Sequence, residues 1–392
     1  MSTRLALGIS VLWIPLAFLF DGVTVLLLPV KVSGSSNPAS AVGLVSFAGL
    51  GAALVVQPIA GRISDRLRRR IDRRLFAAIV AIPVLVGLWL LVGATSILLV
   101  AVGYLILQVS ASGLQSAQQT FIPEHVERPA RGRAAGLKTA FDVGGAFLAF
   151  MSLGLLLGGG DTLGAAVVIS VLLAVSVGLV AILVPPTRGP IARGPDDVWT
   201  ALPAGFVRLV AARFLFLLGT YGIGRFLLLL IADRMGIDPA RAAGEAGGLL
   251  ALFALVTALA AVPFGAVADR VGQVPVMRLG VLLSAVGIAA FIPSVGIGGV
   301  VIAGTIMSLG TAAFVSANWA ATTELVPAQH AGRLMGIANL GTGGAAACAG
   351  LLGPLIDWGG FTPGILVGVL ATLIALAPLA VRVAPRTLEQ PI

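Results

Sequence analysis

The chain has 392 residues, of which 58% are hydrophobic and only 10% are charged, and its mean hydropathy is +1.07. Soluble proteins carry about 25% charged residues, so this composition excludes a soluble globular fold and indicates that lipid surrounds most of the chain. The net charge of +9 would suit nucleic acid only if the basic residues covered a water-facing surface, and no such surface is visible in the sequence. His125, His330 and Cys348 have no neighbouring ligand residues, so we expect no metal site and no cofactor.

The apolar runs predict membrane helices, because a hydrocarbon core about 30 Å thick needs roughly 20 apolar residues per span. The first run is too long for the apolar part of a signal peptide, and we expect it to be retained. The sequence therefore predicts an all-α membrane protein with 12 transmembrane helices. They are expected near 7–30, 39–60, 75–93, 96–119, 134–159, 162–184, 206–231, 243–268, 276–294, 297–321, 332–356 and 362–381.

The basic residues lie almost entirely on one side of the predicted membrane. Of the 25 Lys and Arg residues, only Lys31, Arg234 and Arg241 fall on the other side, and Arg225 falls inside a span. Basic residues accumulate in cytoplasmic loops, so we expect a cell (inner) membrane protein with both termini in the cytoplasm. The densest cluster is GRISDRLRRRIDRR at 61–74, which is either a topology anchor that also touches anionic lipid or a more specific device.

The second half of the chain repeats the first. GRISDR at 61–66 recurs as GAVADR at 265–270, and RGRAAG at 131–136 recurs as AGRLMG at 331–336. A proline-rich segment lies between the halves and is typical of a linker. The sequence thus predicts two pseudo-symmetric six-helix bundles, at 1–184 and 206–392, joined by a cytoplasmic linker at 185–205.

These motifs resemble the major facilitator superfamily of secondary transporters, whose loop between the second and third helices carries a G-x-x-x-D-R-x-G-R-R/K pattern. SDRLRRRIDRR after Gln57-Pro58-Ile59, and TELVP with GRLMGIAN at 323–339, look most like the glycoside-pentoside-hexuronide:cation symporters and the related sucrose-transporter-like proteins. The resemblance implies a monomeric transporter that works by alternating access.

The resemblance also implies a conformational gate that holds the cytoplasmic side closed. A helix is expected to end near Gly61, where its free carbonyl groups and the loop charges would meet a neighbouring helix only in the closed state. The alternative is local loop capping without any dependence on state. The gate residues expected are Gly61, Asp65 and Arg66, the second copy Asp269 and Arg270, and Glu124 and Glu324 as candidate partners of the arginines.

Polar residues on one helical face predict a substrate site. In the resembled family spans one, four, seven and ten line a central cavity, and span four carries Gln108, Gln115 and Gln119 on one face. Tyr221 and Arg225 in span seven and Asn318 in span ten complete the expected substrate-binding set. Amides and hydroxyls suit a sugar, because they both donate and accept hydrogen bonds. Hydrogen bonding between helices is the alternative explanation.

Ionisable residues inside the spans are the candidates for coupling to a proton or sodium ion. Asp21 and Arg225 are expected at similar depth, and moving Arg225 away from Asp21 would change the proton affinity of that carboxyl group. A permanent structural pair is the alternative. Lys138 and Asp142, four residues apart in span five, form either part of an ion path or a mutually neutralising pair.

Other classes of protein lack support in the sequence. No phosphate-binding G-x-x-x-x-G-K-[ST] motif indicates a primary pump, and no cluster of His, Cys or paired carboxylates indicates an enzyme. Together with the polar and ionisable span residues, the resemblance implies proton- or cation-coupled symport of a sugar-like small molecule. The alternative is proton-driven export of drugs or lipophilic metabolites.

Overall fold

The computed structural model describes residues 2–67, 70–127, 130–186, 202, 204–325 and 331–380, and for Asp65, Gly132 and 331–336 it describes the backbone alone. Every regular element in these ranges is a helix, and 12 helical stretches are long and apolar enough to cross a membrane. This confirms the predicted all-α membrane fold with 12 spans. Most of the predicted linker at 185–205 lies outside the described residues.

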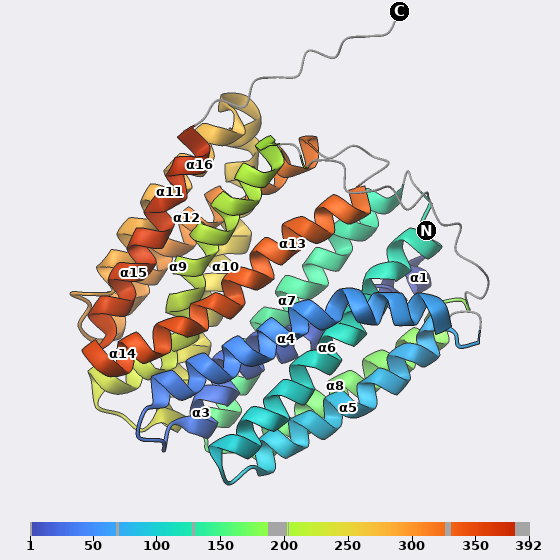
Figure 1. Ribbon diagram of the computed structural model, residues 1–392, viewed down its shortest axis with the longest axis horizontal. Helices are drawn as coiled ribbons and strands as arrows, with labels where there is room; N and C mark the ends of the chain where they lie inside the picture. The colour runs from blue at the N-terminus through green and yellow to red at the C-terminus, as the bar shows by residue number, and fades with distance from the viewer. Residues whose placement is uncertain are drawn as a thin grey trace, which may run out of the picture.

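The first and the eleventh spans are built from several short elements, whereas most others are single helices (Figure 1). The elements are α1 (Thr3–Gly8), α2 (Trp13–Ala17), η1 (Phe18–Leu27), α3 (Leu28–Val32), α4 (Pro38–Leu67), α5 (Arg73–Gly93), α6 (Ile97–His125), α7 (Arg131–Gly158), α8 (Thr162–Leu183), α9 (Ala204–Met235), α10 (Pro239–Val271), α11 (Gln273–Ala290), α12 (Gly296–Glu324), α13 (Ala331–Cys348), η4 (Ala349–Leu352), α14 (Gly353–Gly359), α15 (Phe361–Ile374) and α16 (Leu376–Ala380).

Polar caps fix several helix starts at the edges of the apolar runs. Ser96 accepts a hydrogen bond from the backbone N–H of Leu99 at 3.3 Å, and Asp161 accepts one from Gly164 at 2.7 Å. Such caps satisfy backbone donors that the first turn of a helix leaves free. They allow each apolar run to begin as a helix at the membrane edge.

The expectation that a helix ends near Gly61 is wrong, because α4 continues through the whole GRISDR motif to Leu67. In the same way α10 runs through GAVADR to Val271. A glycine ends a helix when it takes a left-handed conformation, as Gly272 does after α10 with φ 93°. Gly61 is not among the positive-φ glycines. Both motifs therefore lie on helical turns that extend beyond the apolar span.

The halves of the chain meet along two sets of helices. In Figure 1 α4 and α13 run side by side across the middle, and α4 also packs against η4 and α14. The second contact joins α7 to α10. Glycines make both approaches close: a Cβ at Gly43 would collide with the backbone of Gly350, and a Cβ at Gly247 would lie 2.6 Å from Gly154 Cα. Small residues let helices approach closely in lipid.

A carboxylate adds a polar contact between the halves. Asp357 in α14 accepts hydrogen bonds from the backbone N–H groups of Ala39 at 3.2 Å and Ser40 at 2.6 Å. These two donors belong to the first turn of α4, where the positive end of the helix dipole favours an anion. We call this end of the molecule the closed end. The interface there combines backbone packing with a charge-assisted contact.

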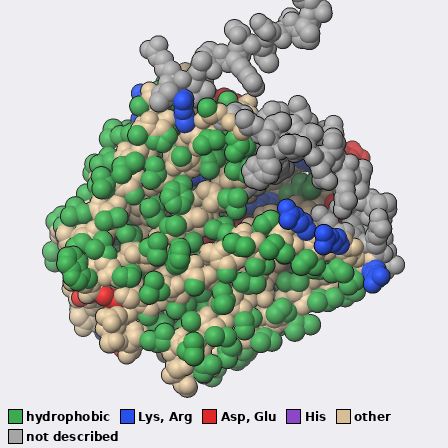
Figure 2. Space-filling view, in the orientation of Figure 1, with side chains coloured by type: hydrophobic (Ala, Val, Ile, Leu, Met, Phe, Trp, Pro, Cys, Tyr) green, Lys and Arg blue, Asp and Glu red, His purple; other side chains and the backbone are tan. Residues whose placement is uncertain are grey.

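We call the other end of the molecule, which holds the N-terminus and the connections that follow α4 and α6, the basic end. Figure 2 shows a face covered mostly by hydrophobic side chains, with Lys and Arg side chains gathered toward the basic end. This distribution matches a body embedded in hydrocarbon with charged groups at one boundary.

Candidate substrate and coupling site

A cavity of about 510 Å³ lies between the two halves of the chain. Side chains from the first span, α4, α6, α7, α9, α10 and α13 line it, and they include charged, amide, hydroxyl and aromatic groups. The lining residues are Trp13, Leu16, Ala17, Phe20, Asp21, Thr24, Val25, Leu50, Ala53, Leu54, Gln57, Ser112, Gln115, Gln119, Lys138, Asp142, Phe150, Tyr221, Gly224, Arg225, Leu250, Asn339, Thr342, Gly343 and Ala346.

The cavity extends from the middle of the molecule toward the basic end. Gln119 lies about two turns before the end of α6, and Lys138 lies about two turns after the start of α7, both on the side of the basic end. In the opposite direction the glycine contacts and Asp357 hold the closed end together. The cavity therefore extends toward the basic end, while direct contacts between the halves block the closed end.

Asp21 lies on the cavity wall in η1, a π-helical stretch of the first span. Its side chain is accessible because it faces the cavity. π-Helical segments are rare and often mark functional sites, because the extra residue per turn changes where side chains point. The sequence pattern predicted one regular helix here and gave no sign of this irregularity.

Arg225 reaches the same cavity from α9, in the other half of the chain. The residue is only 4% exposed; its Nη2 donates to the carbonyl of Ala346 at 2.7 Å, while Nε and Nη1 have no hydrogen-bond partner. Asp21 and Arg225 line the same cavity, and no ion pair joins these two described residues. Each half therefore supplies one ionisable group of opposite sign.

Lys138 and Asp142 form the predicted pair along α7, with Nζ and Oδ2 3.2 Å apart. The ammonium group of Lys138 also lies 3.8 Å from the ring centroid of Trp13, a distance that gives a cation–π contact. Both charges are thus already partnered within the first half of the chain. Their role in ion coupling stays a prediction.

Three of the other expected substrate residues, Gln115, Gln119 and Tyr221, line the cavity together with Arg225. Gln115 accepts a hydrogen bond from Gln57 at 3.0 Å, which joins α6 to α4. Gln57 is therefore a further polar residue of the wall, which the sequence analysis quoted only as part of a motif.

Gln108 and Asn318 do not line the cavity. Gln108 is fully buried and donates to Thr24 and to the carbonyl of Leu19, at 3.1 and 3.3 Å. Asn318 is fully buried between α12 and α9, where it accepts from Arg213 Nε at 2.7 Å and donates to the carbonyl of Leu209 at 3.1 Å. Both residues form the hydrogen bonds between helices that were the alternative explanation.

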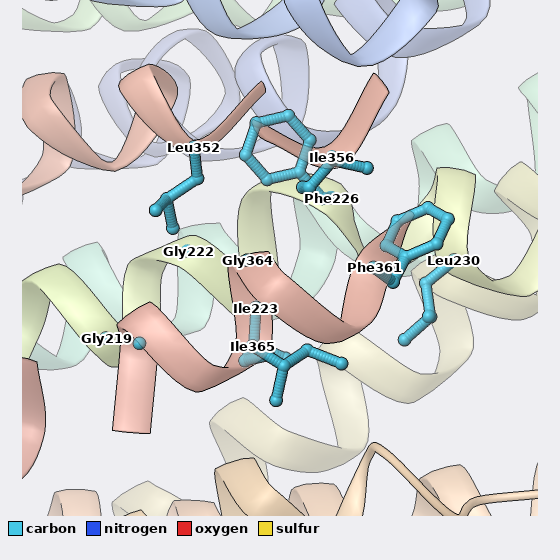
Figure 3. A pocket seen from close by; sticks show the side chains of 11 residues that line it. Gly219, Gly222, Ile223, Phe226, Leu230, Leu352, Ile356, Phe361, Gly364 and Ile365 are labelled. Carbon is cyan, nitrogen blue, oxygen red and sulfur yellow. The ribbon is translucent and has the colours of Figure 1, made fainter. Parts of the chain in front are cut away.

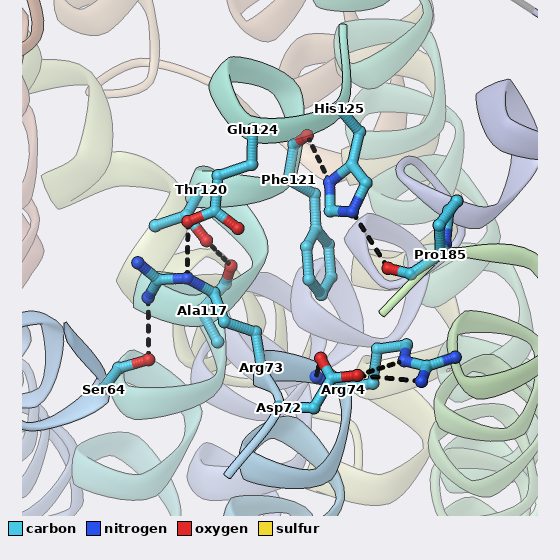
Figure 4. Close-up of polar contacts among 10 residues, drawn as sticks. All are labelled: Ser64, Asp72, Arg73, Arg74, Ala117, Thr120, Phe121, Glu124, His125 and Pro185. Atoms are coloured by element: carbon cyan, nitrogen blue, oxygen red, sulfur yellow. Dashed lines mark hydrogen bonds and ion pairs between the residues drawn. The ribbon is translucent and has the colours of Figure 1, made fainter. Parts of the chain in front are cut away.

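Glu124 pairs with an arginine of the 61–74 cluster other than Arg66. Arg73 Nε lies 2.7 Å from Glu124 Oε1, and Arg73 Nη1 donates to Ser64 at 2.8 Å (Figure 4). Arg73 is 2% exposed, so this contact is an interior one that joins α4, α5 and α6. Part of the arginine cluster therefore holds helices together.

The second half carries a neutral counterpart of this contact. Glu324 accepts a hydrogen bond from Gln273 at 2.7 Å, and no ion pair joins it to Arg270. Arg66, Asp269 and Arg270 are exposed, and the side chain of Asp65 lies outside the description. Among the described side chains of the two motif copies, Arg66, Asp269 and Arg270 form no hydrogen bond or ion pair with the other half of the chain in this state.

A second, much smaller pocket of about 20 Å³ lies between α9, α14 and α15 (Figure 3). Its wall consists of glycines and apolar side chains such as Phe226 and Leu352. This gap holds no group that could orient a polar solute.

Sequence reasoning missed several residues of the main cavity, among them Trp13, Phe20, Phe150 and Asn339. Aromatic residues in a span read equally well as lipid-facing or packed side chains, so periodicity alone does not separate them. Asn339 was quoted only as part of a motif. Two sequence signals did reach the cavity, namely part of the polar face of α6 and the ionisable residues inside the spans.

A membrane-embedded body with a polar cavity between its two halves is the architecture of a secondary transporter. The chain matches the family described as Major Facilitator Superfamily over residues 14–244 and 209–392, and it belongs to that family. It is a transporter and not an enzyme. No curated protein matches the chain in sequence.

Solved transporters share the fold at low sequence identity. The POT family transporter PepTSo has a TM-score of 0.74 at 12% identity, with 97% of this chain and 98% of that chain covered. The nucleoside transporter NupG has a TM-score of 0.70 at 14% identity, with coverage of 96% and 97%. A bacterial homologue of the human lysosomal transporter Spinster, inward-facing and occupied, has a TM-score of 0.69 at 15% identity, with coverage of 96% and 94%. At these identities the likeness establishes the fold alone.

Proposed function

We propose that the chain is a proton-coupled symporter of a small polar solute with sugar-like hydrogen-bonding groups, working in the cell membrane with both termini in the cytoplasm. The observation that carries the proposal is that the two halves bring two oppositely charged residues, Asp21 and Arg225, to one cavity, where Nε and Nη1 of Arg225 have no hydrogen-bond partner. The motifs at 61–74 and 323–339 make the glycoside-pentoside-hexuronide:cation symporters the branch to test first.

Asp21 is the proposed coupling residue. A carboxyl group in a cavity wall of low dielectric changes its proton affinity when a guanidinium approaches or withdraws. Asp21 and Arg225 lie in different halves, so a rocking movement of one half against the other changes their separation. Asp21 would then bind and release one proton in each transport cycle. The Lys138–Asp142 pair would stay neutral overall throughout the cycle.

Gln57, Gln115, Gln119 and Tyr221 are the proposed contacts for the solute. Their amide and hydroxyl groups both donate and accept, which matches the hydroxyl groups of a sugar. Gln108 and Asn318 are not part of this proposal, because their hydrogen bonds are made inside the bundles.

The two ends of the molecule form the proposed gates. Contacts among α4, α14, α7 and α10 seal the closed end in this state. In the other state the helical turns that carry Gly61, Asp65 and Arg66, and Asp269 and Arg270, would approach neighbouring helices at the basic end. Glu124 and Glu324 lie in the same region but already bond to Arg73 and Gln273.

Export of a lipophilic compound is the second candidate function, and the aromatic part of the wall supports it. Trp13, Phe20 and Phe150 line the same cavity as the charged groups. An amphiphilic cation could lie against these rings, near Asp21. In this case the exported compound and the proton would cross the membrane in opposite directions.

Proton movement in liposomes distinguishes the two functions. Purified protein is reconstituted with a pH indicator inside the vesicles, and pentoses, hexoses, hexuronates, disaccharides and glycosides are added in turn. Solute-dependent proton flux in the direction of solute entry supports symport. Silence across the panel, together with proton-driven efflux of a cationic dye, would overturn the symport proposal in favour of export.

A further inference from the structure

Arg225 has hydrogen-bond donors at the cavity that no acceptor of the described chain satisfies. Arg225 is buried, with only 4% of its surface exposed, and two of its three guanidinium nitrogen atoms, Nε and Nη1, have no hydrogen-bond partner. An unpaired guanidinium in a low-dielectric interior is costly, because the donors have lost water and gained nothing in exchange. Charged residues inside a membrane span therefore point to a partner that arrives during function.

The geometry of the guanidinium favours a planar oxyanion. Nη2 carries two hydrogens and donates to one acceptor, the carbonyl of Ala346. Whichever hydrogen is used, one complete two-donor edge remains, formed by Nη2 with either Nε or Nη1. Such an edge matches the two oxygens of a carboxylate or a phosphate.

The charges around the cavity limit the ligand to one negative charge. Among the described residues of the lining, Lys138 and Asp142 already neutralise each other, which leaves Asp21 and Arg225. When Asp21 holds a proton, the remaining charge is the single positive charge of Arg225. A monoanion then gives a neutral cavity, whereas the dianion of a phosphate monoester leaves a net negative charge in a poorly screened space.

We infer that the transported solute carries one carboxylate group, which binds Arg225 while Asp21 is protonated. This inference rests on the proposed transport function and names the substrate class of the same site. The carboxylate of Asp21 and that of the solute would compete for one guanidinium. Protonation of Asp21 removes the competitor, so proton and solute bind together and cross the membrane without net charge.

Binding to the purified full-length protein tests the substrate class without a gradient. Thermal unfolding is followed with three matched pairs, each an acid and its amide: benzoate and benzamide, lactate and lactamide, glucuronate and glucuronamide. Glucose 6-phosphate is added as the phosphate arm. We expect at least one acid to stabilise the protein with an apparent affinity about tenfold or more above that of its amide, since a site built for charged hydrogen bonds rejects an isostere that cannot make them.

Variants of Arg225 assign the effect to this side chain. Arg225→Gln should reduce binding of the preferred acid to the level of its amide, and Arg225→Lys should retain part of it because the charge stays and the two-donor edge is lost. Arg208→Gln removes the same charge from α9 outside the cavity lining and should leave acid binding unchanged. The acid and amide comparison in the wild type needs no variant, so it remains decisive where a variant does not fold.

Four results would overturn the inference: an amide that binds as well as its acid, preference for glucose 6-phosphate, acid binding that survives Arg225→Gln, or no stabilisation by any acid. Each leaves the proposed transport function standing, because proton flux in liposomes measures it separately. Conversely, selective acid binding without any proton flux would support the carboxylate site and contradict coupled transport.

Discussion

Asp357 offers a direct way to shift the equilibrium between the two states of the transporter. Its carboxylate accepts two backbone hydrogen bonds from the first turn of α4, at Ala39 and Ser40, across the interface between the halves. A hydrogen bond to a charged group contributes about 1.5–3 kcal/mol, and an anion at a helix N-terminus adds about 0.3–1 kcal/mol. Asp357→Asn keeps one acceptor oxygen and loses the charge. We expect it to destabilise the closed end by about 1–2 kcal/mol, a factor of about 5–30 in the ratio of the two states.

The separation of the two halves at the closed end is the quantity to measure. Spin labels are attached at the exposed positions Leu98 and Val295 through Leu98→Cys and Val295→Cys, in a Cys348→Ser background that removes the one native cysteine. Electron-electron distance measurements should show a larger long-distance population for Asp357→Asn. Asp357→Ala, which removes both acceptors, should enlarge that population further.

Asp161→Asn is the matched control for this experiment. Asp161 also accepts a hydrogen bond from a backbone N–H, that of Gly164 at 2.7 Å, but it caps its own helix. The variant removes one acidic charge at the same end of the molecule without touching the interface. Unchanged distances in both Asp357 variants, or an equal change in Asp161→Asn, would refute the reasoning.

Three further predictions concern packing and buried polar contacts. Gly247→Leu should reduce transport about tenfold or more, because a side chain at this position cannot fit against α7 and overpacking costs about 1–3 kcal/mol. Gly248 has open space around it, so Gly248→Ala should transport normally. Equal uptake by both variants would contradict this prediction. Glu124→Ala should lower the free energy of unfolding by about 1.5–3 kcal/mol, because the buried guanidinium of Arg73 loses its charged hydrogen bond to this carboxylate, and an unfolding temperature equal to that of the wild type would count against an interior pair. Asn318→Ala should cost about 1–3 kcal/mol of stability and leave the order of preference among solutes unchanged; an altered order would return this residue to the substrate site.

The sequence was sufficient for the global architecture because hydrocarbon imposes a simple length rule. A span needs about 20 apolar residues, so the lengths of the apolar runs along the sequence predicted 12 spans and their order. The Lys138–Asp142 contact could be predicted as well, because residues four apart on a helix are neighbours whatever surrounds them. The spans and the Lys138–Asp142 contact both depend only on residues that are close together in the sequence.

Contacts between distant helices could not be predicted in the same way. Helical phase placed Gln108 and Gln115 on similar faces of α6, but only the packing of η1 decides that Gln108 bonds to Thr24 while Gln115 reaches the cavity. Gly61 suggested a helix end, but its φ is not positive and α4 continues past it to Leu67. Asp357 escaped notice because its partners are backbone N–H groups, which no side-chain pattern records.

The central claim is that Asp21 couples the proton to the solute, and proton-driven accumulation in liposomes tests it most directly. Wild type and Asp21→Asn are reconstituted side by side, and uptake of the solute found by the binding panel is measured with and without an imposed pH gradient. The account predicts gradient-driven accumulation in the wild type and its loss in Asp21→Asn, with exchange of solute across the membrane retained. Accumulation by Asp21→Asn at the proton-to-solute ratio of the wild type would contradict it.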